Sequence, residues 1–337
     1  MWIIIIFLFF SNLIDLIKLF LGNKTFVLLL LPIYLFTYQL LNYFFGFYSI
    51  DHSVQVGLCP FTLNVGYFWS VFAASSLVFI NAIGLNLVVN RNNFYDRNTY
   101  IVALLYIVFM SLFHCSYFLN PILFLHSIFI LILHQLFDFN KQEDIRKNVF
   151  NAFLFFGIGI TVSPSIGFLI PLFIIAVMVI RPFSWKEVFP SIVGIIIPFI
   201  YYFSISYISD SSYDFSQLFI NSQLPKKDFW FIVIATFIFI LLCFFAVIIK
   251  TRKTKIQTSK QIRSLVVLLT SFLAFSIYQI LSFQQIEFLS LVFLPLSILL
   301  ILAFLGDSYA NAAHIIFYIL FGYSVIKFFL FLPTKDV

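Results

Sequence analysis

Long apolar runs separated by short polar segments make up most of this 337-residue chain. Each run is roughly as long as the 20 apolar residues that a helix needs to cross the hydrocarbon core of a bilayer. We therefore predict an all-α fold, a polytopic transmembrane helical bundle of about 10–11 spans. The predicted spans are 24–46, 67–89, 99–119, 121–139, 149–164, 166–181, 188–208, 228–250, 264–282, 286–305 and 311–332. The short pair 149–164 and 166–181 forms either two full spans or a re-entrant pair.

The first 22 residues fit this pattern less well. The opening "MWIIIIFLFFSNL" has no basic residue before its apolar run and no small-residue cleavage site, so it does not read as a signal peptide. Asp15 and Lys18 follow, and they favour a short N-terminal or interfacial helix over residues 1–22. Residues 23–337 are then predicted to form a single transmembrane helical domain.

Composition excludes a soluble protein. The chain is 63% hydrophobic and 9% charged, whereas soluble domains carry about 25% charged residues. The mean hydropathy is +1.09. The expected partner is the lipid bilayer, with membrane proteins as further candidate partners. No nucleic acid is expected, because the net charge of +6 comes from loops without a basic patch among exposed aromatics.

The basic residues predict the orientation of the bundle. With the N-terminus in the cytoplasm, fifteen of the nineteen Lys and Arg residues fall on the cytoplasmic side and three on the opposite side. The remaining one, Lys327, lies within the last predicted span. This asymmetry follows the positive-inside rule and predicts a multi-pass protein of the bacterial inner (cytoplasmic) membrane.

Ionisable residues inside a membrane are costly, so they are candidates for function. His114 lies near the outer end of the third predicted span and His126 lies just inside the fourth. The two histidines are predicted to approach each other across the short "LNP" turn. No HxxxH-type spacing and no CxxC pair exists, so we predict no metal site and no cofactor. The alternative role of each histidine is a hydrogen bond to a neighbouring helix.

A second candidate site lies in the first predicted outer loop, at 47–66. Asp51 and His52 stand there, just beyond the first predicted span. A loop carboxylate followed by many hydrophobic helices is the layout of GT-C-type glycosyltransferases, which use a polyprenyl-phosphate-linked sugar. In that hypothesis Asp51 and His52 are catalytic, with Asp51 as general base. Lys226 and Lys227 are the candidates to contact the phosphate of the lipid-linked substrate.

A third hypothesis is a small-molecule or lipid transporter. The stretch "GIGITVSPSIGFLIP" at 157–171 contains glycines and prolines that favour an irregular helix. Ser163 and Ser165 are then candidate ligand contacts inside the membrane. The alternative is a tight Ser-Pro turn that simply joins two helices.

The segment 91–202 carries a resemblance to a known family. "RPFSWKE" at 181–187, followed by "GIIIP" at 194–198, matches a junction of the form RPF-x-W-[KR]-E and then G-x-x-x-P. On these residues the chain resembles an uncharacterised family of multi-pass inner-membrane proteins from Bacteroidota, a domain of unknown function. The resemblance extends over about 12–332 and implies no activity. The resulting interpretation is an integral inner-membrane protein of unknown molecular function, acting as a subunit of a membrane complex, with the transferase and the transporter as alternatives.

Overall fold

The computed structural model describes residues 14–22, 24–48, 53–55, 62–64, 66–92, 94–95, 98–139, 145–182, 184–208, 228–251, 256–305 and 310–330. The α-helices are α2 (Ile14–Leu21), α3 (Leu30–Phe45), α4 (Tyr67–Arg91), α5 (Ile101–Met110), α6 (Pro121–Asp138), α7 (Arg146–Val162), α8 (Ile170–Ile180), α9 (Trp185–Ile208), α10 (Phe229–Thr251), α11 (Ile256–Phe283), α12 (Phe293–Phe304) and α13 (Ala310–Leu330). Short 3₁₀ helices are η1 (Thr25–Leu29), η2 (His114–Ser116), η3 (Pro164–Leu169) and η5 (Glu287–Val292). The predicted all-α fold is confirmed.

Eight of the helical segments are long and apolar enough to cross a membrane. Two shorter apolar segments, Ile101–Met110 and Pro164–Ile180, accompany them. The chain is therefore a multi-pass integral membrane protein.

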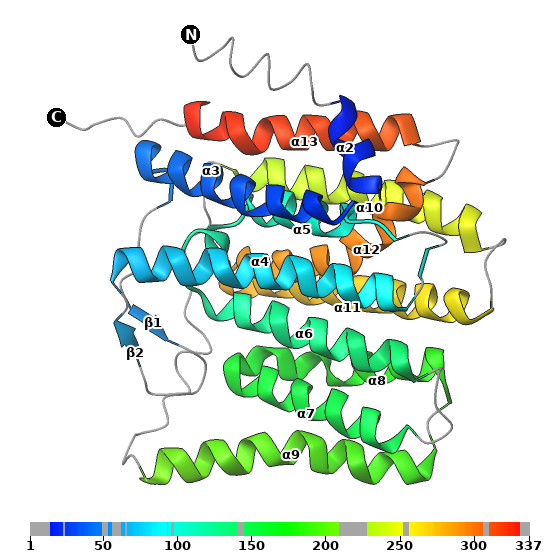
Figure 1. Ribbon diagram of the computed structural model, residues 1–337. Helices are drawn as coiled ribbons and strands as arrows, with labels where there is room; N and C mark the ends of the chain where they lie inside the picture. Colours follow the sequence, from blue (N-terminus) through cyan, green and yellow to red (C-terminus); the bar gives the residue numbers. More distant parts are fainter. Residues whose placement is uncertain are drawn as a thin grey trace.

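The helices lie side by side with their axes nearly parallel (Figure 1). Neighbours along the stack include α3 with α13, α4 with α5, α6 with α7, and α7 with α9. Two strands, β1 (Ser53–Gln55) and β2 (Thr62–Asn64), pair antiparallel with Val54 opposite Leu63. They lie at one end of the bundle, which we call the hairpin end (Figure 1).

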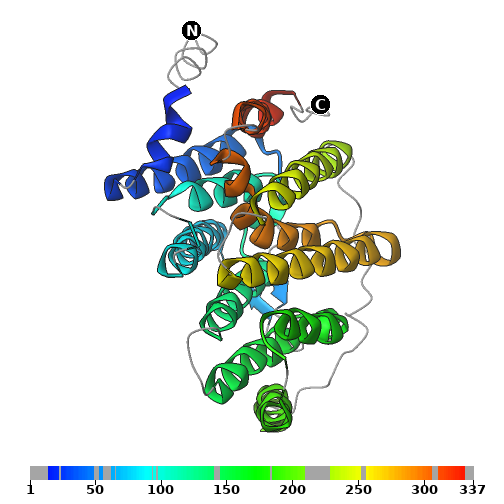
Figure 2. The ribbon, with the colours of Figure 1, turned by 90° about the vertical axis from the view of Figure 1, so that its right-hand side faces the viewer.

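Two central helices are surrounded by protein on all sides. Every residue of α5 and of α12 is buried, and Figure 2 shows both inside the bundle. Such all-round apolar helices occur where no face meets water. Hydrophobic burial against neighbouring helices therefore fixes this pair as the core of the protein.

The third predicted span differs from the structure. We predicted a helix over 99–119, but α5 ends at Met110 and residues 111–120 follow as irregular chain with the short η2. Backbone groups of this segment bond partly to nearby groups and partly to side chains from distant elements. The Ser111 hydroxyl donates to the Val108 carbonyl, and the Tyr117 hydroxyl donates to the Ser111 carbonyl. Non-helical backbone at membrane depth is tolerated only where protein or a cavity surrounds it, and this segment is almost wholly buried.

Close packing of two glycines attaches α9 to α7. A Cβ on Gly157 would lie 2.8 Å from the Ile195 carbonyl oxygen, and one on Gly194 would lie 2.8 Å from the Phe150 carbonyl oxygen. Small residues at membrane helix contacts let backbones approach in this way. Pro198, four residues after Gly194, also touches the Gly157 position, at 3.1 Å. The "GIIIP" part of the family-like motif thus forms the contact surface of α9.

The junction before α9 is a capped turn. The Ser184 backbone N–H donates to the Glu187 carboxylate at 3.0 Å, and the Glu187 N–H donates to the Ser184 carbonyl at 2.9 Å. Satisfying orphan donors at a helix start in this manner stabilises the N-terminus. Glu187 of "RPFSWKE" therefore has a structural role at the start of this helix.

The N-terminal helix α2 belongs to the same assembly. Ile17 and Phe20 are fully buried and Lys18 is exposed. The backbone N–H of Tyr100 donates to the Phe20 carbonyl at 2.9 Å, which connects α2 to the start of α5. One face of α2 thus packs on the bundle while the other carries a charge.

Candidate functional site at the hairpin end

A lysine is completely buried near the end of α13. Lys327 has no exposed surface, and its ammonium Nζ donates to the Tyr48 hydroxyl at 3.0 Å and to the Ser111 carbonyl at 2.6 Å. No carboxylate lies within ion-pair distance of Lys327 among the described residues. A buried charge without a close counter-charge is expensive, and within a membrane such a group marks a functional site by default.

Aromatic rings complete the surroundings of this ammonium. Its Nζ lies 5.3 Å from the ring centroid of Phe47, 4.8 Å from that of Tyr48, 5.4 Å from that of Tyr117 and 5.1 Å from that of Phe328. Ring faces attract cations within about 6 Å. The rings therefore replace part of the hydration that Lys327 has lost, without neutralising its charge.

Two carboxylates stand near Lys327 without pairing with it. Asp228, at the start of α10, is 3% exposed and accepts a 2.6 Å hydrogen bond from the Tyr323 hydroxyl through Oδ1. Its Oδ2 is buried and has no hydrogen-bond partner in the described chain. Glu287, at the start of η5, is half-buried and accepts the Cys115 backbone N–H at 3.1 Å. Both carboxylates lie close enough to Lys327 to act on it electrostatically.

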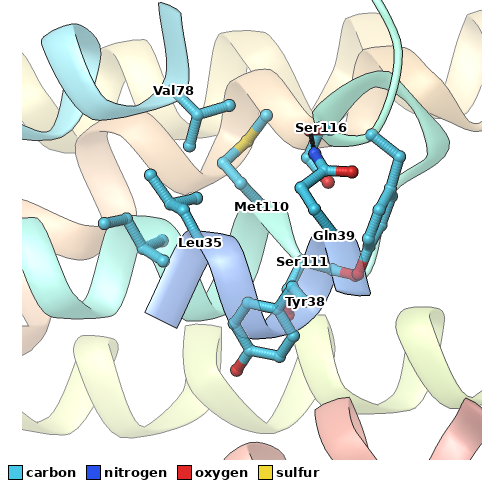
Figure 3. A pocket seen from close by; sticks show the side chains of 9 residues that line it. Leu35, Tyr38, Gln39, Val78, Met110, Ser111 and Ser116 are labelled. Carbon is cyan, nitrogen blue, oxygen red and sulfur yellow. Dashed lines mark hydrogen bonds between the residues drawn. The ribbon is translucent and has the colours of Figure 1, made fainter. Parts of the chain in front are cut away.

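A small cavity adjoins the lysine. Its volume is about 10 Å³, which is space for roughly one water molecule. In Figure 3 the apolar side chains of Leu35 and Val78 lie on one side of the cavity, and Gln39, Ser111 and Ser116 lie on the other. The Gln39 amide donates to the Ser116 carbonyl at 3.2 Å.

The cavity and the lysine share their walls. Ser111 and Tyr117 line the cavity and contact Lys327. Tyr38, also in the wall, hydrogen-bonds Ser324 of α13 at 2.7 Å. The buried charge and the cavity therefore form one site, which we call the Lys327 site.

A separate buried network surrounds His126. Its Nδ1 lies 2.9 Å from the Tyr106 hydroxyl and its Nε2 lies 3.0 Å from the Ser290 hydroxyl. The Ser290 hydroxyl also donates to the Glu287 carbonyl at 2.6 Å. Both ring nitrogens thus have partners, as buried polar groups require. This network ties α6, α5 and η5 together.

The other predicted histidine occupies different surroundings. His114 is half-buried, with its ring 5.5 Å from the Tyr48 ring and 5.3 Å from the Phe118 ring. The structure therefore directs His114 towards the Lys327 site and His126 into its own network. The described residues contain no group of three or more His, Cys, Asp and Glu side chains that is placed to hold a metal ion.

The predicted contacts at 157–171 form a turn. The Ser163 and Ser165 hydroxyls hydrogen-bond each other at 3.0 Å, and both residues are half-buried. The Ser163 N–H donates to the Gly159 carbonyl, which ends α7, and the Ile166 N–H donates to the Ser163 carbonyl.

The four residues predicted for a transferase site, Asp51, His52, Lys226 and Lys227, lie outside the described residues.

Sequence reasoning missed the central residue of the site. Lys327 is the single Lys or Arg that lies inside a predicted span rather than at its first or last position, and that position alone was a sufficient signal. Its partners were not visible, because Tyr48 and Ser111 lie 279 and 216 positions away in the chain.

Comparison with known proteins adds no relative. No family model, no curated protein and no solved structure matches this chain. What can be said of function therefore rests on the geometry above.

Proposed function

We propose that this membrane protein is a small-molecule transporter whose binding site is the Lys327 site. One observation carries the proposal: buried ionisable groups converge where a central helix gives way to irregular backbone. Transporters build their sites from interrupted helices, since helix ends and free backbone groups contact the substrate there. Here α5 stops at Met110, and Lys327 donates to the carbonyl of the very next residue.

This binding site is not the one that was predicted from the glycines and prolines at 157–171. That stretch forms a tight turn beside the close contact between α7 and α9. We also propose that the protein resides in a bacterial inner membrane with its N-terminus in the cytoplasm. The hairpin end then faces outward. Membership of the Bacteroidota family stays a prediction.

Cysteine accessibility tests this proposal without knowledge of the substrate. Cys59, Cys115 and Cys243 are replaced by alanine, and Ser116, in the cavity wall, is replaced by cysteine. A membrane-impermeant methanethiosulfonate reagent is then applied to right-side-out and to inside-out vesicles. A transporter exposes its site alternately to both sides, so we expect Ser116→Cys to react in both preparations.

Ser165→Cys is the matched control. It lies in η3, just after the end of α7, and is expected to react from the outer side only. Reaction of Ser116→Cys from the outer side alone would instead favour a transferase with a lipid-linked substrate. Absence of reaction from both sides would favour a structural subunit of a membrane complex. Either result refutes the transporter.

A further inference from the structure

We propose that Asp228 binds a small monovalent cation and that the Lys327 ammonium is a built-in competitor that releases a proton when this cation binds. The inference deepens the proposed transport function, on which it rests, by naming the coupling ion of the same site. It makes the protein an exchanger of a cation against a proton.

The first argument is the unused oxygen of Asp228. The carboxylate is 97% buried, its Oδ1 is held by the Tyr323 hydroxyl, and its Oδ2 has no hydrogen-bond partner in the described chain. An unpaired buried carboxylate oxygen is unfavourable, because it has lost its water without gaining a hydrogen-bond partner. A cation at Oδ2 would remove that cost.

The second argument is the position of Lys327. Tyr323 and Lys327 are four residues apart on α13, so they share one face of the helix, one turn apart. Tyr323 holds Asp228, which places the lysine close to the carboxylate without an ion pair between them. Lys327 thus supplies positive charge to the neighbourhood of Asp228 and leaves its Oδ2 open.

The groups that face the pair come from several elements. Tyr48 and His114 belong to the segments that follow α3 and α5, and the Tyr48 hydroxyl contacts Lys327. Tyr117 faces the ammonium through its ring. Glu287 of η5 is the second carboxylate that acts on Lys327. A further titratable side chain close by is Tyr38 of α3, which contacts Ser324 of α13.

Charge counting gives the stoichiometry. The Lys327 ammonium carries one positive charge, and a monovalent cation at Asp228 brings a second one close to it. Two cations close together in a medium of low dielectric repel strongly. Loss of one proton from the Lys327 ammonium to water removes that repulsion and leaves a neutral amine. One cation enters, one proton leaves, and no redox step is involved.

The kind of cation follows from the ligands. A divalent ion needs six to eight oxygen ligands or several His and Cys side chains. The described residues offer no group of three or more His, Cys, Asp and Glu side chains that could hold such an ion. One carboxylate and the Tyr323 hydroxyl are oxygen ligands that suit Na⁺ or Li⁺ better.

The experiment measures proton release from the purified full-length chain in detergent micelles. The protein is held in weakly buffered solution with a pH-indicator dye, and NaCl is added, with choline chloride as the ionic-strength control. We expect release that approaches one proton per chain with Na⁺ and none with choline. LiCl and KCl report the size preference. Equal signals from NaCl and choline chloride would overturn the proposal.

Three variants locate the effect. Asp228→Asn keeps an oxygen for the Tyr323 hydroxyl but removes the charge, and should release no proton. Lys327→Met should also release none, yet its melting temperature should respond to at least tenfold lower Na⁺ because the competitor is gone. Lys18→Met, on the exposed face of α2, should behave as the wild type. Proton release by Asp228→Asn at the wild-type level would refute the assignment.

Folding of each variant is checked by size-exclusion chromatography. If Asp228→Asn does not fold, the comparison of proton release with Na⁺ and with choline in the wild-type protein still tests the proposal. Proton release also separates this inference from the proposed function. A protein that binds Na⁺ without alternating access would release the proton while Ser116→Cys reacts from one side only.

Discussion

Substitution of Gly194 by alanine tests the contact that attaches α9 to the bundle. The new Cβ would lie 2.8 Å from the Phe150 carbonyl oxygen and 3.0 Å from the Leu154 backbone nitrogen. Both neighbours are backbone atoms of α7, so no side-chain rotation relieves the clash. Restoring an ordinary contact of roughly 3.4 Å requires a separation of about 0.6 Å along that direction. Overpacking of this kind costs about 1–3 kcal/mol.

The gain in helix propensity that opposes this packing cost is smaller. Alanine gains about 1 kcal/mol over glycine in helix propensity, so we expect a net loss of up to about 2 kcal/mol in the free energy of unfolding. Gly159→Ala is the control, because its Cβ would meet only the side chains of Ile128 and Leu125, at 3.6 and 3.9 Å. That variant should be neutral or more stable by up to about 1 kcal/mol.

Reversible unfolding of the purified protein in mixed detergent–lipid micelles or bicelles measures both variants. If Gly194→Ala is as stable as Gly159→Ala, then α9 does not depend on close backbone approach. The same result would remove the structural explanation for the "GIIIP" segment. Chemical crosslinking between α7 and α9 would show whether the helices have separated.

The remaining predictions concern buried polar groups and orientation. The His126→Ala substitution should lower the free energy of unfolding by about 2–5 kcal/mol, because it opens a cavity and leaves the Tyr106 and Ser290 hydroxyls without their shared partner. Chemical unfolding measures this loss, and a value below about 0.5 kcal/mol would contradict the network. Lys327→Met should keep or raise stability, by up to about 4 kcal/mol, since an apolar side chain replaces a buried charge; a lowered melting temperature would show instead that the lysine stabilises the fold. A fluorescent protein that folds only in the cytoplasm should be bright when inserted at 141–144 and dark at the C-terminus, and the reverse pattern would invert the proposed orientation.

Hydrophobic run length is enough to predict most of this fold. Each of the eleven predicted spans overlaps a helix. A helix inside a membrane carries apolar side chains along its whole length, whether they face lipid or other helices, so a long apolar run marks it in the sequence. The prediction fails where apolar residues are not helical. Residues 111–119, "SLFHCSYFL", read as the end of a span, yet they are irregular. Hydropathy indicates that a residue is buried. In the interior of a bundle, however, a residue can be buried without being part of a helix.

The candidate site was less predictable for a different reason. Ser163 and Ser165 stand out in sequence because glycine and proline surround them, but a Ser-Pro turn needs the same residues. Lys327 stands out only as a charge in an apolar helix. The cost of that charge depends on Tyr48, Ser111 and Asp228, which come from three distant segments. Such long-range convergence cannot be predicted from local pattern.

The shortness of α5 bears on how the chain enters the membrane. A ten-residue helix covers about 15 Å, half of the hydrocarbon core, and lipid never contacts it in the folded protein. Alone, it would leave the unpaired backbone of 111–120 facing hydrocarbon during synthesis. We therefore expect α5 to be inserted together with α4 and α6, both of which are long enough to span. The central helix of this protein would thus depend on its neighbours for insertion before it supports them in the finished bundle.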